Sequence, residues 1–228
     1  MLMQRRSLLL CVGLAPALAG AQIAPAATEQ AVYRGLHDAA QRGNLAALRQ
    51  ALAGASDVNG RDSHGRTPLH VATFARQRDV IQQLAGAGAK LGELENDRYD
   101  AVTIAAVADD EDTLRMLLAL GASAKLITSR YDGTALIAAA HLGHDGVVRQ
   151  LIAAGAPLDH VNNLHWTAVI ESVVLGDGGA RHQATLRALV DAKANLQLTD
   201  RSGRTPLALA RERGYVAMVQ MLEGAGAR

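Results

Sequence analysis

The segment Thr67-Pro68-Leu69-His70-Val71-Ala72 decides the fold, because versions of it return along the chain. The later versions start at residues 100, 134, 167 and 205, so successive starts are 33, 34, 33 and 38 residues apart. They read Asp100–Ala105 (DAVTIA), Thr134–Ala139 (TALIAA), Thr167–Ile170 (TAVI) and Thr205–Ala210 (TPLALA). A degenerate copy, Arg34-Gly35-Leu36-His37, precedes them. A period of this length predicts a repeat protein of about six units.

Each unit predicts two short helices. Thr67 and Thr205 are followed by proline; the threonine hydroxyl can cap the first N–H groups of a helix, and proline suits its first turn. Apolar residues at three- and four-residue spacing, such as Leu114, Leu117 and Leu118, predict a second helix. A Gly-Ala pair 21 residues after four of the starts suits the end of that helix. We therefore expect an all-α chain.

These repeats resemble the ankyrin repeat family, on Thr67-Pro68-Leu69-His70, Gly143-His144 and Asp57-Val58-Asn59. The resemblance implies two antiparallel helices per unit, a hairpin-like loop projecting from one edge, and a concave binding face. The expected fold is an ankyrin-repeat α-solenoid of about six helix-turn-helix repeats, in which neighbours cover one another's apolar faces. The domain is expected over residues 31–228, with repeats near 34–66, 67–99, 100–133, 134–166, 167–204 and 205–228.

Two units depart from this pattern at the position after the second helix. Ala55 stands there in the first unit and Lys193 in the fifth, where other units have glycine. A residue with a Cβ in a left-handed conformation costs on the order of 1 kcal/mol, so both units are expected to be less stable than units two to four. The fifth unit also carries five extra residues, 177–181, which we expect to form a flexible bulge.

The N-terminus predicts export. Arg5 and Arg6 precede an apolar run over residues 8–18, and Ala19-Gly20-Ala21 has the small-x-small pattern of a cleavage site. We predict a signal peptide over residues 1–21 and a flexible tether over 22–30. The paired arginines also resemble a twin-arginine signal, so this route and the Sec route both stay open. The chain is expected to be periplasmic or secreted.

Charge and cysteine content exclude several classes of function. The chain has 23 Lys+Arg against 22 Asp+Glu, and removal of residues 1–21 takes away Arg5 and Arg6. A near-neutral chain offers no basic surface for nucleic acid, and no membrane attachment is expected after signal cleavage. Cys11 is the one cysteine and lies in the predicted leader. The mature chain therefore has no disulfide, thiolate metal site or cysteine nucleophile, and we expect no cofactor and no catalytic residue.

The histidines leave one alternative open. His141 and His144 are three residues apart, and His165 follows in the next predicted loop; together they could serve a metal-dependent factor or an enzyme. Gly143 is expected to end the first helix between the pair, which argues against a shared face, and we predict no metal site. The resemblance implies that His37, His70 and His144 instead hydrogen-bond neighbouring backbone.

Two acidic features receive structural interpretations. Residues 109–112 (DDED) are expected to form a solvated turn that favours the next helix N-terminus. Glu171 stands where the other units have Val71, Ile104, Ala138 and Leu209. We expect open packing there, or a Lys or Arg from a neighbouring unit.

The candidate site is a protein-binding surface. The resemblance implies that contacts come from loop tips and the exposed side of the first helix, and four aromatic residues fall in these slots: Phe74, Tyr99, Tyr131 and Trp166. We predict that they form a stripe that binds a protein, since such rings anchor interfaces. The other candidates are His64, Arg66, Arg130, His141, Arg201 and Arg204.

The expected function is that of a non-enzymatic protein–protein interaction module. It would act as an exported scaffold, or as a stabiliser or inhibitor of another exported protein, and we expect a monomer. A secreted effector that binds a host protein is a further alternative with the same fold.

Overall fold

The computed structural model describes residues 24–228. The predicted signal peptide, residues 1–21, and the first residues of the predicted tether lie outside this range. Within it the chain forms thirteen α-helices and no β-strand, so the all-α prediction is confirmed. Among these residues no helix combines the length and apolar character needed to cross a membrane.

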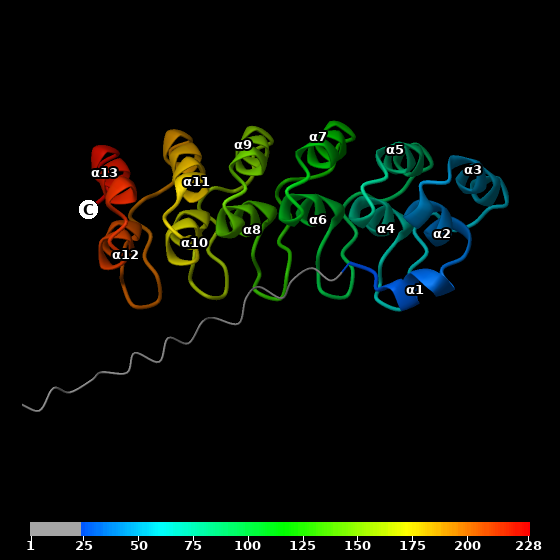
Figure 1. Cartoon of the computed structure of the whole chain (residues 1–228), viewed down its shortest axis with the longest axis horizontal. Helices are drawn as coiled ribbons and strands as arrows, with labels where there is room; N and C mark the ends of the chain where they lie inside the picture. Colours follow the sequence, from blue (N-terminus) through cyan, green and yellow to red (C-terminus); the bar gives the residue numbers. More distant parts are fainter. Residues whose placement is uncertain (1–23) are drawn as a thin grey trace, which may run out of the picture.

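Helices α2 to α13 form two parallel rows, and α1 lies outside them (Figure 1). The first row contains α2 (Gly35–Arg42), α4 (Pro68–Phe74), α6 (Ala101–Val107), α8 (Ala135–Leu142), α10 (Ala168–Val174) and α12 (Pro206–Glu212). The second row contains α3 (Leu45–Ala53), α5 (Arg78–Gly86), α7 (Glu111–Ala119), α9 (Asp145–Ala153), α11 (Ala180–Asp191) and α13 (Val216–Gly224). Each helix packs on its pair and on the same helix of the next unit, which gives the predicted six-unit solenoid.

The caps that the sequence predicts start the first-row helices. The Thr134 and Thr205 hydroxyls accept hydrogen bonds from the backbone N–H groups of Ile137 and Ala208. The acidic turn acts in the same way, because Asp110 caps α7 and accepts from the Thr113 N–H at 3.1 Å. The expectation that residues 109–112 favour the following helix is confirmed, but they are not a solvated turn throughout, because Asp110 is 4% exposed and Glu111 and Asp112 already belong to α7.

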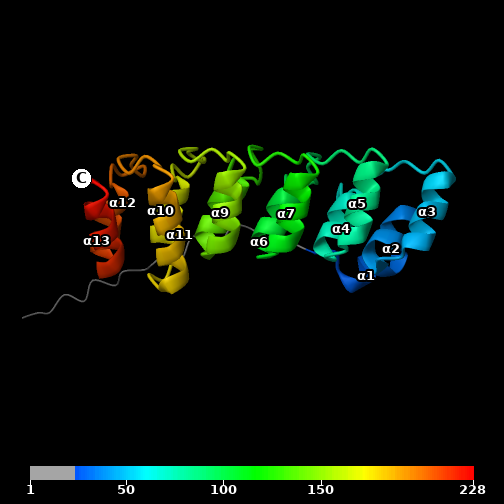
Figure 2. The same cartoon turned by 90° about the horizontal axis from the view of Figure 1, so that it is seen from above.

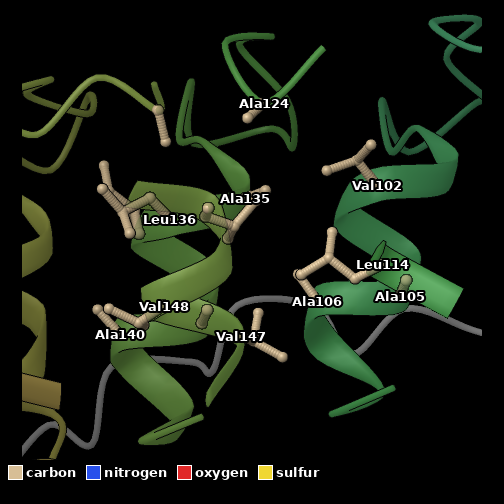
Figure 3. Close-up of a cluster of buried hydrophobic side chains, with 14 of the residues drawn as sticks. Val102, Ala105, Ala106, Leu114, Ala124, Ala135, Leu136, Ala140, Val147 and Val148 are labelled. Atoms are coloured by element: carbon tan, nitrogen blue, oxygen red, sulfur yellow. The ribbon is translucent and has the colours of Figure 1, made fainter. Parts of the chain in front are cut away.

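Small side chains let the units approach closely. Figure 3 shows Ala105 and Ala106 of α6 on the side toward α8, where Ala135 lies, while Ala140 lies on the side of α8 toward the next unit; larger residues such as Leu114 fill the space between the rows. These alanines are at most 3% exposed, and Leu114 is fully buried. The buried residues form one cluster that runs through the units. No unit therefore covers its own apolar face, as expected for a solenoid.

Five connections project along one edge of the stack (Figure 2). We call them fingers 1 to 5, and they comprise residues 54–67, 87–100, 120–134, 154–167 and 192–205. Backbone hydrogen bonds of 2.9–3.0 Å join the first four fingers in series: Asn96 N–H to His64 O, Ser129 N–H to Arg98 O, and Asn163 N–H to Tyr131 O. The fingers are therefore positioned relative to one another and not only by their own helices.

Two sequence-based expectations change. Residues 27–30, predicted as part of a flexible tether, lie in the short helix α1 (Ala27–Val32). The extra residues of the fifth unit do not form a simple bulge: Ala180 and Arg181 begin α11, which has 12 residues where the other second-row helices have nine.

The left-handed position after the second helix is confirmed in both unusual units. Ala55 has φ 56° and Lys193 has φ 68°, where Gly88 and Gly121 have φ 90° and 95°. Both non-glycine residues thus adopt a backbone conformation that favours glycine.

Candidate protein-binding surface

Fingers 3 and 4 carry the aromatic side chains that remain accessible at the centre of the stack. Tyr131 lies at the end of finger 3 and Trp166 at the end of finger 4, and both are half-buried. Trp166 also packs against the hydrophobic core. Phe74, at the end of α4, is half-buried as well. Three of the four predicted rings therefore retain accessible surface, and their role in binding stays a prediction.

Tyr99 does not belong with them. It is only 7% exposed, and its backbone N–H donates to Glu95 Oε1 at 3.0 Å inside finger 2. Its carbonyl accepts from His70 Nε2 at 3.2 Å, and burial raises the pKa of its hydroxyl. The predicted four-ring stripe is wrong at this position, because Tyr99 packs inward to close the finger onto α4.

Arg66 is also buried, contrary to its prediction as an accessible loop residue. Its side chain is 4% exposed and lies 3.1 Å from Glu29 Oε2 and 3.6 Å from Asp62 Oδ2. His64, in the same finger, keeps a side chain that is 47% exposed, and its Nδ1 lies 2.8 Å from Glu29 Oε1. Both candidates thus contact α1, a helix that the sequence did not predict.

His141 is the third buried candidate. Its Nδ1 lies 3.3 Å from Glu171 Oε2, and Asn162 Nδ2 donates to Glu171 Oε1 at 2.9 Å. Glu171 is 5% exposed, so the site is not open, and its partners are a histidine and an asparagine instead of the expected Lys or Arg. His141 therefore contributes to the contact between units four and five and is not part of an accessible binding face.

The three histidines of the metal-site alternative have separate environments. His144 Nδ1 donates to Ala106 O at 2.9 Å, as the resemblance implies, while His165 is exposed in finger 4. Residues 24–228 contain no group of three or more His, Cys, Asp or Glu side chains arranged to hold a metal ion. The spacing in the sequence does not bring His141, His144 and His165 together as ligands.

The remaining arginine candidates connect neighbouring segments. Arg130 pairs with Asp97 of finger 2 at 3.0 Å, and Arg201 donates to Asn163 O of finger 4 at 2.8 Å. Arg204 pairs with Asp200 at 2.7 Å within finger 5. Arg130 and Arg201 are exposed, and Arg204 has a side chain that is 45% exposed. The Arg130–Asp97 ion pair is exposed on both sides and contributes little to stability, so Arg130 is free to exchange this partner for one on another protein, whereas Arg204 pairs with the buried Asp200.

Three apolar residues that the sequence analysis did not select extend the accessible surface. Ile127 is 48% exposed on finger 3, and Val161 and Leu164 are 40% and 37% exposed on finger 4. Ile127 and Val161 occupy matching positions in consecutive repeats, 34 residues apart. Their alignment could have revealed them, because matched residues of a solenoid face the same way.

We define the finger 3–4 surface as Ile127, Tyr131, Val161, Leu164 and Trp166. Asn163 fixes the two fingers together, since its N–H donates to Tyr131 O at 2.9 Å and its Nδ2 donates to Arg130 O at 3.1 Å. The surface therefore combines exposed apolar groups, two aromatic rings and the neighbouring Arg130 on an ordered backbone. Aromatic residues and arginine are enriched at protein–protein interfaces.

Comparisons with known proteins agree with this architecture. The family model described as "Ankyrin repeats (3 copies)" matches residues 24–95 and 136–228. The chain is 34% identical over 190 residues to the ankyrin repeat protein YahD of Escherichia coli (strain K12), an alignment that covers 83% of this chain and 94% of YahD.

Solved structures show the same fold. The crystal structure of an ankyrin repeat domain from Acinetobacter baumannii is similar with a TM-score of 0.80 and 40% identity, over 85% of this chain and 98% of that one. A chain from the complex of a predatory endopeptidase of Bdellovibrio bacteriovorus with an immunity protein has a TM-score of 0.71 and 23% identity, over 84% of this chain and 98% of that one. At this identity the second likeness concerns the fold alone.

Proposed function

Because the chain belongs to the ankyrin repeat family, whose repeats are protein–protein interaction modules, we propose that it is a non-enzymatic protein that binds another exported protein. It acts there as a scaffold, a stabiliser or an inhibitor. The finger 3–4 surface is the main contact, and the partner is a folded protein or a segment of one.

The exposed apolar side chains of fingers 3 and 4 support this proposal most strongly. Ile127, Val161 and Leu164 are 37–48% exposed at positions that contribute nothing evident to the core. Clustered apolar groups on an ordered surface are typical of interaction sites, because their removal from water stabilises a complex. The fingers are already linked by hydrogen bonds, so little ordering is needed on binding.

The location of the partner follows from the N-terminal sequence. Residues 1–21 combine a basic start, an apolar run and a small-residue cleavage pattern. We propose cleavage after Ala21 and a periplasmic or secreted mature chain. Cell fractionation followed by N-terminal sequencing tests this: a mature chain that begins at Gln22 supports the proposal, and an uncleaved chain in the cytosol contradicts it.

The complex of an endopeptidase with an immunity protein is relevant as a precedent for the fold. It involves a protein that binds an enzyme, which is compatible with an inhibitory role for this chain.

Affinity capture with matched variants tests the surface. The tagged chain is exported in its native host, and co-purifying proteins are compared with those of Val161→Ser and of Val216→Ser. Val216 is 65% exposed on α13, away from the fingers, and serves as the control of the same residue type. A partner that is retained by Val216→Ser and lost by Val161→Ser supports the proposal. Equal capture by all three chains contradicts it.

Once a partner is known, the Trp166→Ala variant measures how much this ring contributes to the binding free energy. We expect binding to weaken by about 2 kcal/mol, as for an aromatic anchor. Because Trp166 also packs against the core, affinity is measured by calorimetry at a temperature where circular dichroism shows the variant to be folded. Unchanged affinity with reduced stability would show that the ring only supports the finger.

A further inference from the structure

The helix α1 lies on the side of the first-row helices from which the fingers project (Figure 1), next to finger 1. Glu29 makes the contact: Oε2 lies 3.1 Å from Arg66 Nη1, and Oε1 lies 2.8 Å from His64 Nδ1. A cavity of about 270 Å³ remains between the two segments, and Glu29, Val32, Arg61 and Asp62 are among its lining residues. The chain thus places one of its own carboxylates on the surface from which a partner is expected to be bound.

The residues of α1 itself are only partly covered, although Pro25, two residues before the helix, is buried. Every one of its six residues is exposed or half-buried, and Val32 is 70% exposed. The firm attachment follows the helix: Tyr33 is 6% exposed and its hydroxyl donates to Asp62 Oδ2 at 2.8 Å. Helix α1 is therefore held at both flanks, by the buried Pro25 and Tyr33, and its own residues are fixed to finger 1 chiefly through Glu29.

Finger 5 contains Arg204, the arginine that matches Arg66, and its second carboxylate comes from a different element. Arg204 follows Asp200 by four residues, as Arg66 follows Asp62, and pairs with it at 2.7 Å. Its Nη1 also lies 3.0 Å from Glu212 Oε2, on the helix that follows the finger. The residue that matches Glu212 on the helix after finger 1 is Phe74, seven residues after the capping threonine in both cases.

The helix after finger 1 therefore lacks the carboxylate that Arg204 uses on the helix after finger 5. Arg66 is nonetheless buried beside Asp62, and α1 supplies the second carboxylate that contacts it. Partial burial disfavours the charged form of Glu29, but hydrogen bonds from Ala26 N–H and Arg66 still lower the pKa of this carboxyl. Finger 1 therefore receives from α1 a carboxylate that the helix after it, α4, does not provide at the position of Phe74.

We propose that Arg66 and His64 form a carboxylate-binding site that Glu29 occupies in cis, and that an acidic, helix-forming segment of the partner binds there by displacing α1. This regulation rests on the proposed function. In the free protein, α1 occupies the site formed by Arg66 and His64. Another ligand binds there only if it replaces the contacts that Glu29 makes. A short linker gives a tethered segment an effective concentration in the millimolar range, so α1 excludes weak ligands.

The probe is a synthetic peptide with the sequence of residues 24–33 and blocked ends, together with its Glu29→Gln form. Each peptide is titrated into the wild-type chain and into the Glu29→Gln chain, and binding is followed by NMR. We expect the unaltered peptide to bind the Glu29→Gln chain at least about tenfold more tightly than the wild-type chain, because two charge-assisted contacts of the competing α1 are lost. The Glu29→Gln peptide is expected to bind neither chain.

Amide hydrogen exchange tests the cis contact without any added ligand. In the Glu29→Gln chain, exchange at residues 27–32 is expected to rise about tenfold while α2 to α13 stay unchanged. Glu223→Gln is the control, because Glu223 pairs with Arg211 at the other end of the stack. This variant should match the wild-type chain in both measurements.

Two results would overturn the proposal. Unchanged exchange at residues 27–32, or equal peptide affinity in both chains, would show that Glu29 does not hold α1 against a carboxylate site. Faster exchange through α2, α3 and α4 in Glu29→Gln would show that α1 is a structural cap and not a displaceable ligand. Neither measurement uses the unknown partner, so failure here is separate from failure of the Val161→Ser capture.

Discussion

Ala55 and Lys193 show how single residues limit the stability of a repeat. Both have positive φ in a position where most units use glycine, and the structure gives neither side chain a hydrogen bond or ion pair that would offset the strain. Arg76 also has positive φ, at 55°, but its guanidinium donates to Ala108 O at 2.9 Å and approaches Asp110. The same backbone conformation therefore has different consequences at different positions.

Replacing either strained residue by glycine should stabilise its unit. We expect Ala55→Gly and Lys193→Gly each to raise the free energy of unfolding by about 0.5–1 kcal/mol, since relief of left-handed strain exceeds the added chain entropy of glycine. Urea unfolding and local hydrogen exchange measure the effect. Arg76→Gly is the matched control and should bring no gain, because it loses the contacts with Ala108 and Asp110; equal gains at all three positions would contradict the argument.

His70 predicts a pH dependence of stability. Burial lowers the pKa of its ring from 6.5 to about 4, while Nδ1 accepts from Thr67 N–H at 3.1 Å and Nε2 donates to Glu93 O at 3.0 Å. The unfolded chain takes up a proton below pH 6.5 and the folded chain does not. The free energy of unfolding is therefore complete above pH 6.5 and falls as the pH drops toward 4, by on the order of 3 kcal/mol.

NMR of the imidazole protons checks this directly. The ring of His70, assigned by comparison with His70→Gln, should remain neutral at pH 5. Urea unfolding of the His70→Gln chain should show a weaker decline between pH 6.5 and 4.5 than the wild-type chain. Titration of His70 near pH 6.5 in the folded protein would refute the expectation.

At the scale of an element, the insertion in the fifth unit acts as a brace between units. Both nitrogens of the His182 ring face oxygen acceptors: Nε2 lies 3.0 Å from His141 O and Nδ1 lies 2.9 Å from Asp177 Oδ1. It also lies over Gly143, where an added Cβ would come within 3.0 Å of the ring. Arg181 reaches past unit four to Asp109 at 2.8 Å. The added residues therefore lengthen α11 to contact the turn between α8 and α9.

The two side chains of this brace should differ in effect. His182→Ala is expected to lower the free energy of unfolding by about 1–2 kcal/mol, because its hydrogen bond to His141 O is lost in a half-buried site. Arg181→Ala should cost less than about 0.5 kcal/mol, because its ion pair with Asp109 is exposed. Chemical denaturation gives both values, and hydrogen exchange at residues 141–145 localises them. A larger effect of Arg181→Ala would mean that the ion pair is the main link.

For the whole molecule, stability should follow the linear arrangement of the units. Each unit contacts its neighbours, and the core runs through all of them. A defect at the centre therefore weakens two interfaces, whereas a defect at an end weakens one. The first and last units should exchange amide hydrogens fastest.

Leu151→Ala tests this arrangement. Leu151 is fully buried in α9, and its truncation should cost about 2–5 kcal/mol. We expect unfolding to become multiphasic, with the units before and after α9 losing structure separately in denaturant. Leu164→Ala, at a residue 37% exposed on finger 4, should change stability by less than about 0.5 kcal/mol. A single unchanged transition in Leu151→Ala would mean that the stack unfolds as one unit.

The sequence by itself determined the period, the paired helices, their caps and the left-handed positions of Ala55 and Lys193. These features depend on residues close in the chain: a threonine caps the N–H groups just after it, and a helix ends where the next residue tolerates positive φ. The same signals repeat in every unit, so each copy supports the others. The family and the solenoid were therefore predictable.

Only the tertiary structure decided which candidate side chains are accessible. Arg66 and Arg204 occupy the same place in their repeats, yet one side chain is 4% exposed and the other 45%. The difference arises because Phe74 stands where the other unit has Glu212, and because Glu29 comes in from α1, 37 residues earlier in the chain. Tyr99 is likewise buried by contacts from another segment. The exposure of a side chain depends on which distant segments of the chain pack beside it, and the local sequence pattern does not specify those segments.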